Sequence, residues 1–197
     1  MAEPVFLHVC CAPCLDATLV GLAELGEITA NFHLFFYNPN IHPLLEYRKR
    51  LKSVHVLNER LRLPLQVQGE YGLEPFLRTV WKDGAAGRCD RCYAVRLVET
   101  ARQAATAGFR RFSSTLCVSP HQSHEAIRAA GDAAGRAHGV EFVYADLRPW
   151  REKTPPRAGL YHQSYCGCIF SENERYADSD RECYRGAADG SEPSGRR

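Results

Sequence analysis

The segment that decides the fold is PVFLHVCCAPCLDATLVGLAEL, residues 4–25. Its first part, residues 4–9, is a short apolar run, which predicts a buried strand. Residues 15–25 carry apolar side chains at helical spacing, which predicts a helix. Three cysteines, Cys10, Cys11 and Cys14, occupy the loop between them. The segment therefore predicts the first strand–helix unit of an α/β protein, with thiols where the chain turns.

The same alternation continues along the chain. We expect further strands at 28–37, 64–67, 112–115 and 141–144, and helices at 44–61, 73–81, 91–107 and 120–138. Strands that alternate with helices predict a Rossmann-like parallel sheet covered by helices on both faces. Beyond Pro149 the pattern becomes irregular, and residues 185–197 are polar enough to predict a disordered tail. We expect one α/β metalloenzyme domain over residues 1–184, followed by that tail.

The composition limits the class of protein. With 197 residues, 45% of them hydrophobic, the chain can bury one ordinary core. No apolar run approaches the roughly 20 residues that span a bilayer, and the first residues show no targeting signal. We therefore expect a cytoplasmic protein with no membrane partner. Because that compartment keeps thiols reduced, the nine cysteines favour metal ligation or a catalytic dithiol over structural disulfides.

Seven of the cysteines fall into three tight clusters. They are Cys10, Cys11 and Cys14, then Cys89 and Cys92, and then Cys166 and Cys168. Spacings this short place thiols within reach of one metal or of each other. We favour a 4Fe-4S cluster, held by Cys10, Cys11, Cys89 and Cys92. A structural zinc ion and four unliganded buried thiols are the alternatives, and a vicinal cysteine pair is not typical of structural zinc.

The pair Cys166 and Cys168 is separated by a single glycine. Such a pair can close a strained disulfide, and strained disulfides have oxidising potentials that suit redox cycling. This makes it a candidate redox dithiol. The pair can equally ligate a second metal together with Cys14 or Asp90, and the sequence leaves these two interpretations open.

Single residues outside the clusters need more caution. His121 and His162 each adjoin a loop that we expect near the site, where a side chain that titrates near neutral pH suits proton transfer. A lone histidine is nevertheless more often structural. We expect Cys117 to be a core residue within an apolar strand and Cys183 to be an incidental exposed thiol.

Seven short motifs follow one another along the chain. They are LHVCCAPC (7–14), YNPNI (37–41), EY (46–47), RCDRCY (88–93), FSST (112–115), SPHQ (119–122) and YCGC (165–168). In this order they resemble the QueH-type epoxyqueuosine reductases, over about residues 7–171. The resemblance implies an oxidoreductase that catalyses the last step of queuosine biosynthesis. In that step the epoxide of epoxyqueuosine, at the wobble position of a tRNA anticodon, is reduced to the cyclopentene of queuosine.

The resemblance also implies a 4Fe-4S cluster, no cobalamin, and a fold akin to the adenine-nucleotide α-hydrolases. Matched residue by residue, it assigns the cluster to Cys10, Cys11, Cys89 and Cys92, and the redox pair to Cys166 and Cys168. Cys14 and Asp90 also match family positions, so a neighbouring mononuclear iron with thiolate and carboxylate ligands stays open. Cys117 departs from the pattern, because the family is expected to have an aliphatic residue there.

The implied chemistry sets demands on the site. Removing an epoxide oxygen to leave an alkene consumes two electrons and two protons, so an external electron donor and a proton donor are needed. The modified base must also leave the anticodon stack. Unstacking a base costs little free energy in a single-stranded loop, and aromatic or arginine side chains can then stack on it. The contacts that we expect for the base are Tyr37, Asn38, Tyr93 and Tyr161, together with Arg48 and Arg50.

Two other functions compete with this one. An Fe-S-dependent tRNA thiolation enzyme on a related fold needs a glycine-rich phosphate loop after the first strand, where this chain has residues 10–14 with no glycine. A zinc-stabilised RNA-binding module is the non-enzymatic alternative. It predicts a colourless protein, whereas an Fe-S protein is brown.

Overall fold

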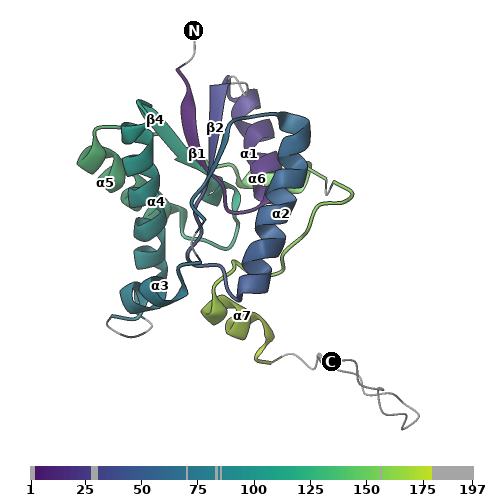
Figure 1. The fold of residues 1–197 in the computed structure, drawn as a ribbon, viewed down its shortest axis with the longest axis vertical. Helices are drawn as coiled ribbons and strands as arrows, with labels where there is room; N and C mark the ends of the chain where they lie inside the picture. The colour runs from purple at the N-terminus through teal and green to yellow at the C-terminus, as the bar shows by residue number, and fades with distance from the viewer. Residues whose placement is uncertain are drawn as a thin grey trace.

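The computed structural model describes residues 3–27, 31–69, 71–82, 84, 86–155 and 157–178. Within these ranges the chain forms a five-stranded sheet in the order β3-β2-β1-β4-β5, with every pair parallel (Figure 1). The strands are β1 (Val5–His8), β2 (Phe32–Phe36), β3 (Leu65–Val67), β4 (Arg111–Ser114) and β5 (Glu141–Phe142). The parallel α/β architecture predicted from the sequence is therefore confirmed.

The central strand β1 is buried along its whole length. Its neighbours are β2 and β4, so that Leu7 lies opposite Leu34 on one side and Ser113 on the other. A strand covered on both faces reads as a continuous apolar run, which is the pattern of residues 4–9. This arrangement brings the ends of β1, β2 and β4 to one edge of the sheet, where parallel α/β proteins bind their ligands.

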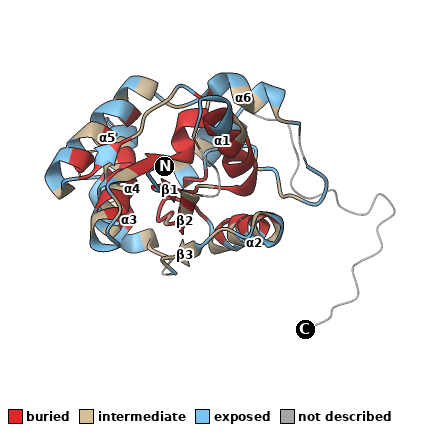
Figure 2. Cartoon of the chain, turned by 90° about the horizontal axis from the view of Figure 1, so that it is seen from above, coloured by how far each residue is buried: buried red, intermediate tan, exposed pale blue. Residues whose placement is uncertain are grey.

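Seven α-helices surround the sheet within the described ranges. They are α1 (Ala12–Glu24), α2 (Leu44–Leu61), α3 (Leu73–Val80), α4 (Arg88–Thr106), α5 (His124–His138), α6 (Arg148–Lys153) and α7 (Ile169–Tyr176). Figure 2 shows α1, α2 and α6 on one face of the sheet and α3, α4 and α5 on the other. The short helix α7 lies beyond the carboxyl edge of the sheet, at the end of the molecule opposite the start of β1 (Figure 1). No described helix combines the length and the apolar character that a bilayer crossing needs.

Several element boundaries differ from the prediction because of local capping. The helix expected at 120–138 begins only at His124, since Ser123 caps it by accepting a hydrogen bond from the Ala126 amide at 3.2 Å. Before it, Thr115–Val118 form a 3-10 helix, η2, so Cys117 lies there and not in a strand. As expected, Cys117 is a buried core residue.

The second cysteine pair also lies differently from the prediction. Helix α4 begins at Arg88 and not at Arg91, directly after Gly87, whose φ of 66° is readily adopted by glycine. Cys89 and Cys92 therefore both lie on the first turns of this helix. At a spacing of three residues, their side chains share one helix face.

The region beyond Pro149 is more regular than predicted. It contains α6 and α7, and the Cys168 thiol caps α7 by accepting a hydrogen bond from the Ser171 amide at 3.4 Å. Cys183, the domain boundary expected at 184 and the tail 185–197 lie outside the described residues.

Candidate metal and redox site

A cavity of about 420 Å³ opens at the carboxyl edge of the sheet. Its lining takes residues from the starts of α1 and α4 and from the segment 163–168. Six of the seven clustered cysteines line it, namely Cys10, Cys14, Cys89, Cys92, Cys166 and Cys168. The seventh, Cys11, lies beside them, with its sulfur 3.7 Å from that of Cys10. Three segments far apart in the sequence thus present their thiols to one space.

The first cluster is the tightest. The sulfur atoms of Cys10, Cys11 and Cys14 all lie within 4.8 Å of one another. The Cys11 thiol caps α1 by accepting a hydrogen bond from the Cys14 amide at 3.4 Å, which folds the loop back on itself. Thr115, at the end of β4, accepts a hydrogen bond from the Cys10 amide at 3.0 Å and donates one to the Cys10 sulfur at 3.2 Å. Three sulfurs held this closely suit a thiophilic metal.

The thiols of this cluster differ in their pKa values. The pKa of the Cys10 thiol lies well below its usual range, because the Cys11 and Cys14 thiols and the Thr115 hydroxyl donate hydrogen bonds to it. Burial raises the pKa of Cys11 to about 12. Cys10 is therefore the thiol of this cluster that most readily becomes a thiolate, the form of cysteine that binds metal.

The second cluster forms another wall of the cavity. Cys89 is exposed and Cys92 is buried, and burial raises the pKa of Cys92 to about 11. Among the described residues, the set of sulfurs within 4.8 Å of one another contains neither of them. The four cysteines expected to hold a 4Fe-4S cluster are thus divided between two walls, and Cys14 is the closest companion of Cys10 and Cys11.

The third cluster is an asymmetric pair of thiols. The sulfurs of Cys166 and Cys168 lie 3.9 Å apart, and both residues are free cysteines. A hydrogen bond from Cys168 lowers the pKa of Cys166 to about 5, whereas the same bond raises the pKa of Cys168. Gly167 between them has a φ of 119°, and a Cβ there would lie 3.0 Å from Arg50 Nη1. Only glycine fits this turn without strain.

Arg50 holds the loop that carries this pair. Its guanidinium donates to the carbonyl oxygens of Tyr165 at 3.1 Å and Cys166 at 3.0 Å. It also pairs with Glu46 at 2.7 Å, and Glu46 in turn accepts a hydrogen bond from the Tyr161 hydroxyl at 2.5 Å. Arg50 is only 1% exposed but lines the cavity, so its contact with the modified base stays a prediction. Its guanidinium positions the loop of residues 165–168, which carries the two thiols.

A second buried arginine, Arg96, faces the thiols. It is 3% exposed, lines the cavity and takes part in no ion pair with a carboxylate of the described residues. Burial lowers its pKa, but the thiols of Cys92, Cys166 and Cys10 together outweigh that effect and raise it. A buried guanidinium needs a partner. Arg96 Nε donates to the Cys92 carbonyl at 3.1 Å, and Cys10 and Cys166, whose pKa values are lowered, are the nearby thiols best able to carry negative charge. No sequence pattern singled out Arg96, although it lies one helical turn after Cys92.

Gln163 is another residue that sequence reasoning missed. Its Nε2 donates to the Cys11 sulfur at 2.8 Å and lies 3.9 Å from the Cys14 sulfur. It comes from the loop before Tyr165, more than 140 residues after the cysteines that it contacts. No local pattern signals such a contact.

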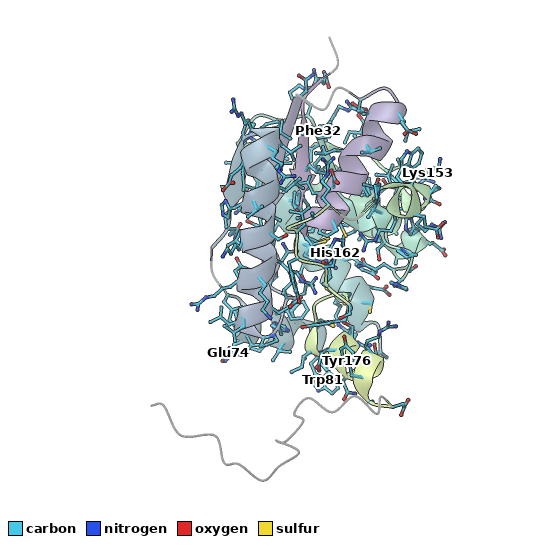
Figure 3. The ribbon with its side chains drawn as sticks, turned by 90° about the vertical axis from the view of Figure 1, so that its right-hand side faces the viewer. Phe32, Glu74, Trp81, Lys153, His162 and Tyr176 are labelled. Carbon is cyan, nitrogen blue, oxygen red and sulfur yellow. The ribbon has the colours of Figure 1, made fainter. Side chains whose placement is uncertain are left out.

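The predicted proton donors are separated by the structure. His121 lines the cavity from the turn before α5. His162 lines a second pocket of about 200 Å³ with Asp16 and Arg157, and Figure 3 shows it in front of the start of α1. Asp90 is exposed on α4 and is not among the described residues that line the main cavity.

The predicted substrate contacts are also divided. Tyr93 lines the cavity, and burial raises its pKa to about 12. Tyr37, Asn38 and Tyr161 are not in the lining that the described residues form. Tyr37 stacks on Phe35, and the Asn38 amide donates to the Val9 carbonyl at 2.8 Å, which ties the ends of β1 and β2 together. Arg48 is exposed on α2.

Comparison with known proteins identifies the family. The model described as "Epoxyqueuosine reductase QueH" matches residues 5–174. A protein of that name from Dehalococcoides mccartyi is 37% identical over 180 residues, which cover 89% of this chain and 96% of that protein. Another protein of the same name, from Thermotoga maritima, is 35% identical over 193 residues, which cover 90% of this chain and 96% of that protein. The matches therefore run over nearly the full length of both relatives, and the chain belongs to the epoxyqueuosine reductase QueH family.

Proposed function

We propose that this chain reduces the epoxide of epoxyqueuosine, at the wobble position of a tRNA anticodon, to the cyclopentene of queuosine. The observation that carries this proposal is the convergence of three cysteine clusters on one cavity of about 420 Å³. The reaction takes up two electrons and two protons, and the epoxide oxygen leaves as water. A tRNA substrate and reduced thiols point to the cytoplasm as the place of this activity.

The cofactor that we propose is a 4Fe-4S cluster. The donor set fits, because Fe-S clusters are held by cysteine thiolates and two walls of the cavity offer them. The proposed ligands are Cys10, Cys11, Cys89 and Cys92. When bound, the cluster supplies single electrons to the cavity. No cobalamin takes part in the proposed reaction.

Cys14 is left over from this assignment. Since its sulfur lies with those of Cys10 and Cys11, it is the residue best placed to ligate a neighbouring mononuclear iron. Asp90 is a weaker second ligand, because it is exposed and outside the cavity lining given by the described residues. The thiols of Cys166 and Cys168 line the same cavity and are the alternative ligands for this ion.

We propose that Cys166 and Cys168 act as a redox pair. Closing a disulfide between them releases two electrons and two protons, which is the number that one epoxide consumes. For this bond to form, the sulfurs must move from 3.9 Å to bonding distance, about 2.05 Å, while the two electrons pass to the epoxide. The lowered pKa of Cys166 favours this oxidation, because the thiolate is oxidised more readily than the thiol. An external electron donor then reduces the disulfide for the next turnover.

Other residues of the cavity bind the substrate and move protons. Tyr93 is the contact that we retain for the modified base, since it lines the cavity. His121 lines it from the turn before α5 and is the proposed donor of a proton to the departing oxygen. Arg96 lines the cavity and stabilises negative charge on Cys10 and Cys166.

The test is anaerobic reconstitution with iron and sulfide, followed by incubation with epoxyqueuosine-containing tRNA and a strong reductant. Mass spectrometry of the nucleosides is expected to show the loss of one oxygen atom. The matched control is Cys117→Val, which changes a buried cysteine outside the cavity and is expected to retain turnover. An unchanged nucleoside, with the cluster intact, would contradict the proposal.

A further inference from the structure

Two stacked aromatic side chains lie at the edge of the cavity. Trp81, directly after α3, and Phe170, in the first turn of α7, have ring centroids 5.1 Å apart and planes inclined by only 4°. Phe170 lines the cavity, whereas Trp81 lies outside it and is 50% exposed. Figure 3 shows Trp81 beside α7. The aromatic stack therefore extends from the cavity wall into solvent.

One arginine contacts this aromatic pair, and further arginines line the cavity. The Arg88 guanidinium carbon lies 5.4 Å from the Phe170 ring centroid, and Arg88 also pairs with Glu174. Arg88, Arg151 and Arg175 all line the cavity. Aromatic faces next to arginines are what proteins use to bind unpaired nucleotides, because the ring stacks a base and the guanidinium contacts phosphate.

Packing against the core explains the position of Phe170 but not the exposed half of Trp81. Phe170 packs against the small core cluster of Phe76, Val80 and Cys92, and Trp81 covers one face of its ring. Half of the tryptophan surface is left in water next to a substrate cavity. Single exposed apolar residues are common and need no explanation. What distinguishes Trp81 is that its ring is stacked parallel to Phe170, a residue of the cavity lining.

The size of the cavity decides which partner fits. A volume of about 420 Å³ lies within the roughly 300–1,000 Å³ of pockets that hold a single ligand. One modified base can enter, and its neighbours in the RNA loop must stay at the rim. We propose that the exposed face of Trp81 stacks the nucleobase adjacent to the wobble base, while Arg88 and Arg175 face the intervening phosphates. This site rests on the proposed function and names the RNA contact that orients its substrate.

Fluorescence tests the stack directly. The chain has two tryptophans, so Trp150→Phe leaves Trp81 as the only indole. An unmodified anticodon stem-loop RNA is titrated into this metal-loaded variant under anaerobic conditions. We expect its binding to quench Trp81 emission and to weaken with rising salt. Binding that leaves the emission unchanged would overturn the proposal.

Substitution tests the energetic role. Trp81→Ala is expected to weaken stem-loop binding about tenfold and to raise KM for the tRNA, with kcat little changed. Trp81→Phe retains a ring and should recover part of that loss. The matched control is Leu25→Ala, since Leu25 is 56% exposed at the far end of α1. Equal RNA affinity of the Trp81→Ala and Leu25→Ala variants would refute the stacking site.

Two further outcomes would also overturn it. A lower unfolding midpoint of Trp81→Ala with unchanged RNA affinity would mean that the stack only holds α7 in place. Slower reduction by the electron donor with unchanged RNA affinity would make the surface a docking site for that donor. In both cases wild-type turnover on tRNA persists, so the proposed function survives. A wild-type protein that neither binds nor reduces the tRNA would instead refute the function.

Discussion

Replacing Arg50 by methionine tests whether a buried ion pair positions the loop of residues 165–168, which carries Cys166 and Cys168. Methionine keeps most of the length and apolar volume of the side chain and removes its charge and all of its donors. The substitution leaves the buried Glu46 carboxylate without its charged partner. It also removes the hydrogen-bond donors to the carbonyl oxygens of Tyr165 and Cys166. The structure therefore predicts a large loss of stability from a residue that lies outside the thiol clusters.

The magnitude follows from these contacts. Removing one partner of a buried ion pair costs about 3–5 kcal/mol, because the remaining charge has no partner. Here Glu46 keeps a hydrogen bond from Tyr161, which lowers the cost, whereas each loop carbonyl left without a donor adds about 1–3 kcal/mol unless water replaces it. We expect the free energy of unfolding to fall by about 3–5 kcal/mol.

Urea denaturation under anaerobic, reducing conditions measures this loss, with circular dichroism as the signal. If the slope of the unfolding free energy against urea concentration is the same for wild type and variant, the shift in midpoint reports a change in stability alone. The matched control is Arg78→Met. Arg78 pairs with Glu74 at the same spacing of four residues, but these side chains are 78% and 73% exposed, against 1% and 7% for Arg50 and Glu46. We expect the control substitution to lower the free energy of unfolding by less than about 1 kcal/mol. Similar losses for both variants would refute the role of Arg50.

The remaining predictions concern the thiols and the core. Cys89→Ala should lose iron and turnover together, which iron analysis and the tRNA assay measure. Cys166→Ser should keep its iron and lose turnover; if iron falls too, the pair is a metal site. Cys117→Val should keep both and change stability by less than about 1.5 kcal/mol. Gly131→Ala would place a Cβ 2.1 Å from the Phe142 ring and should cost about 1–3 kcal/mol in urea denaturation, and a neutral result would contradict this close packing.

Local patterns predicted the elements well where burial follows the repeat of a helix or strand. Helix α2 spans Leu44–Leu61, the range expected from its amphipathic pattern, and β1 lies within the apolar run at 4–9. The errors occur where one side chain decides a boundary. Ser123 delays the start of α5, and Gly87 allows α4 to begin before Cys89. Caps of this kind depend on a few atoms, so periodicity does not detect them.

The sequence alone determined the α/β class, the three thiol clusters and the resemblance to a family, because each of these depends on residues close together in the chain. The tertiary structure decided which clusters meet, that Cys14 joins Cys10 and Cys11, and that the two arginines at 50 and 96 are buried. The physical reason is that a helical pattern identifies an inward face without identifying what that face contacts. Contacts between segments more than 100 residues apart, such as that of Arg50 with the Cys166 loop, arise only when the sheet brings the ends of its strands to one edge.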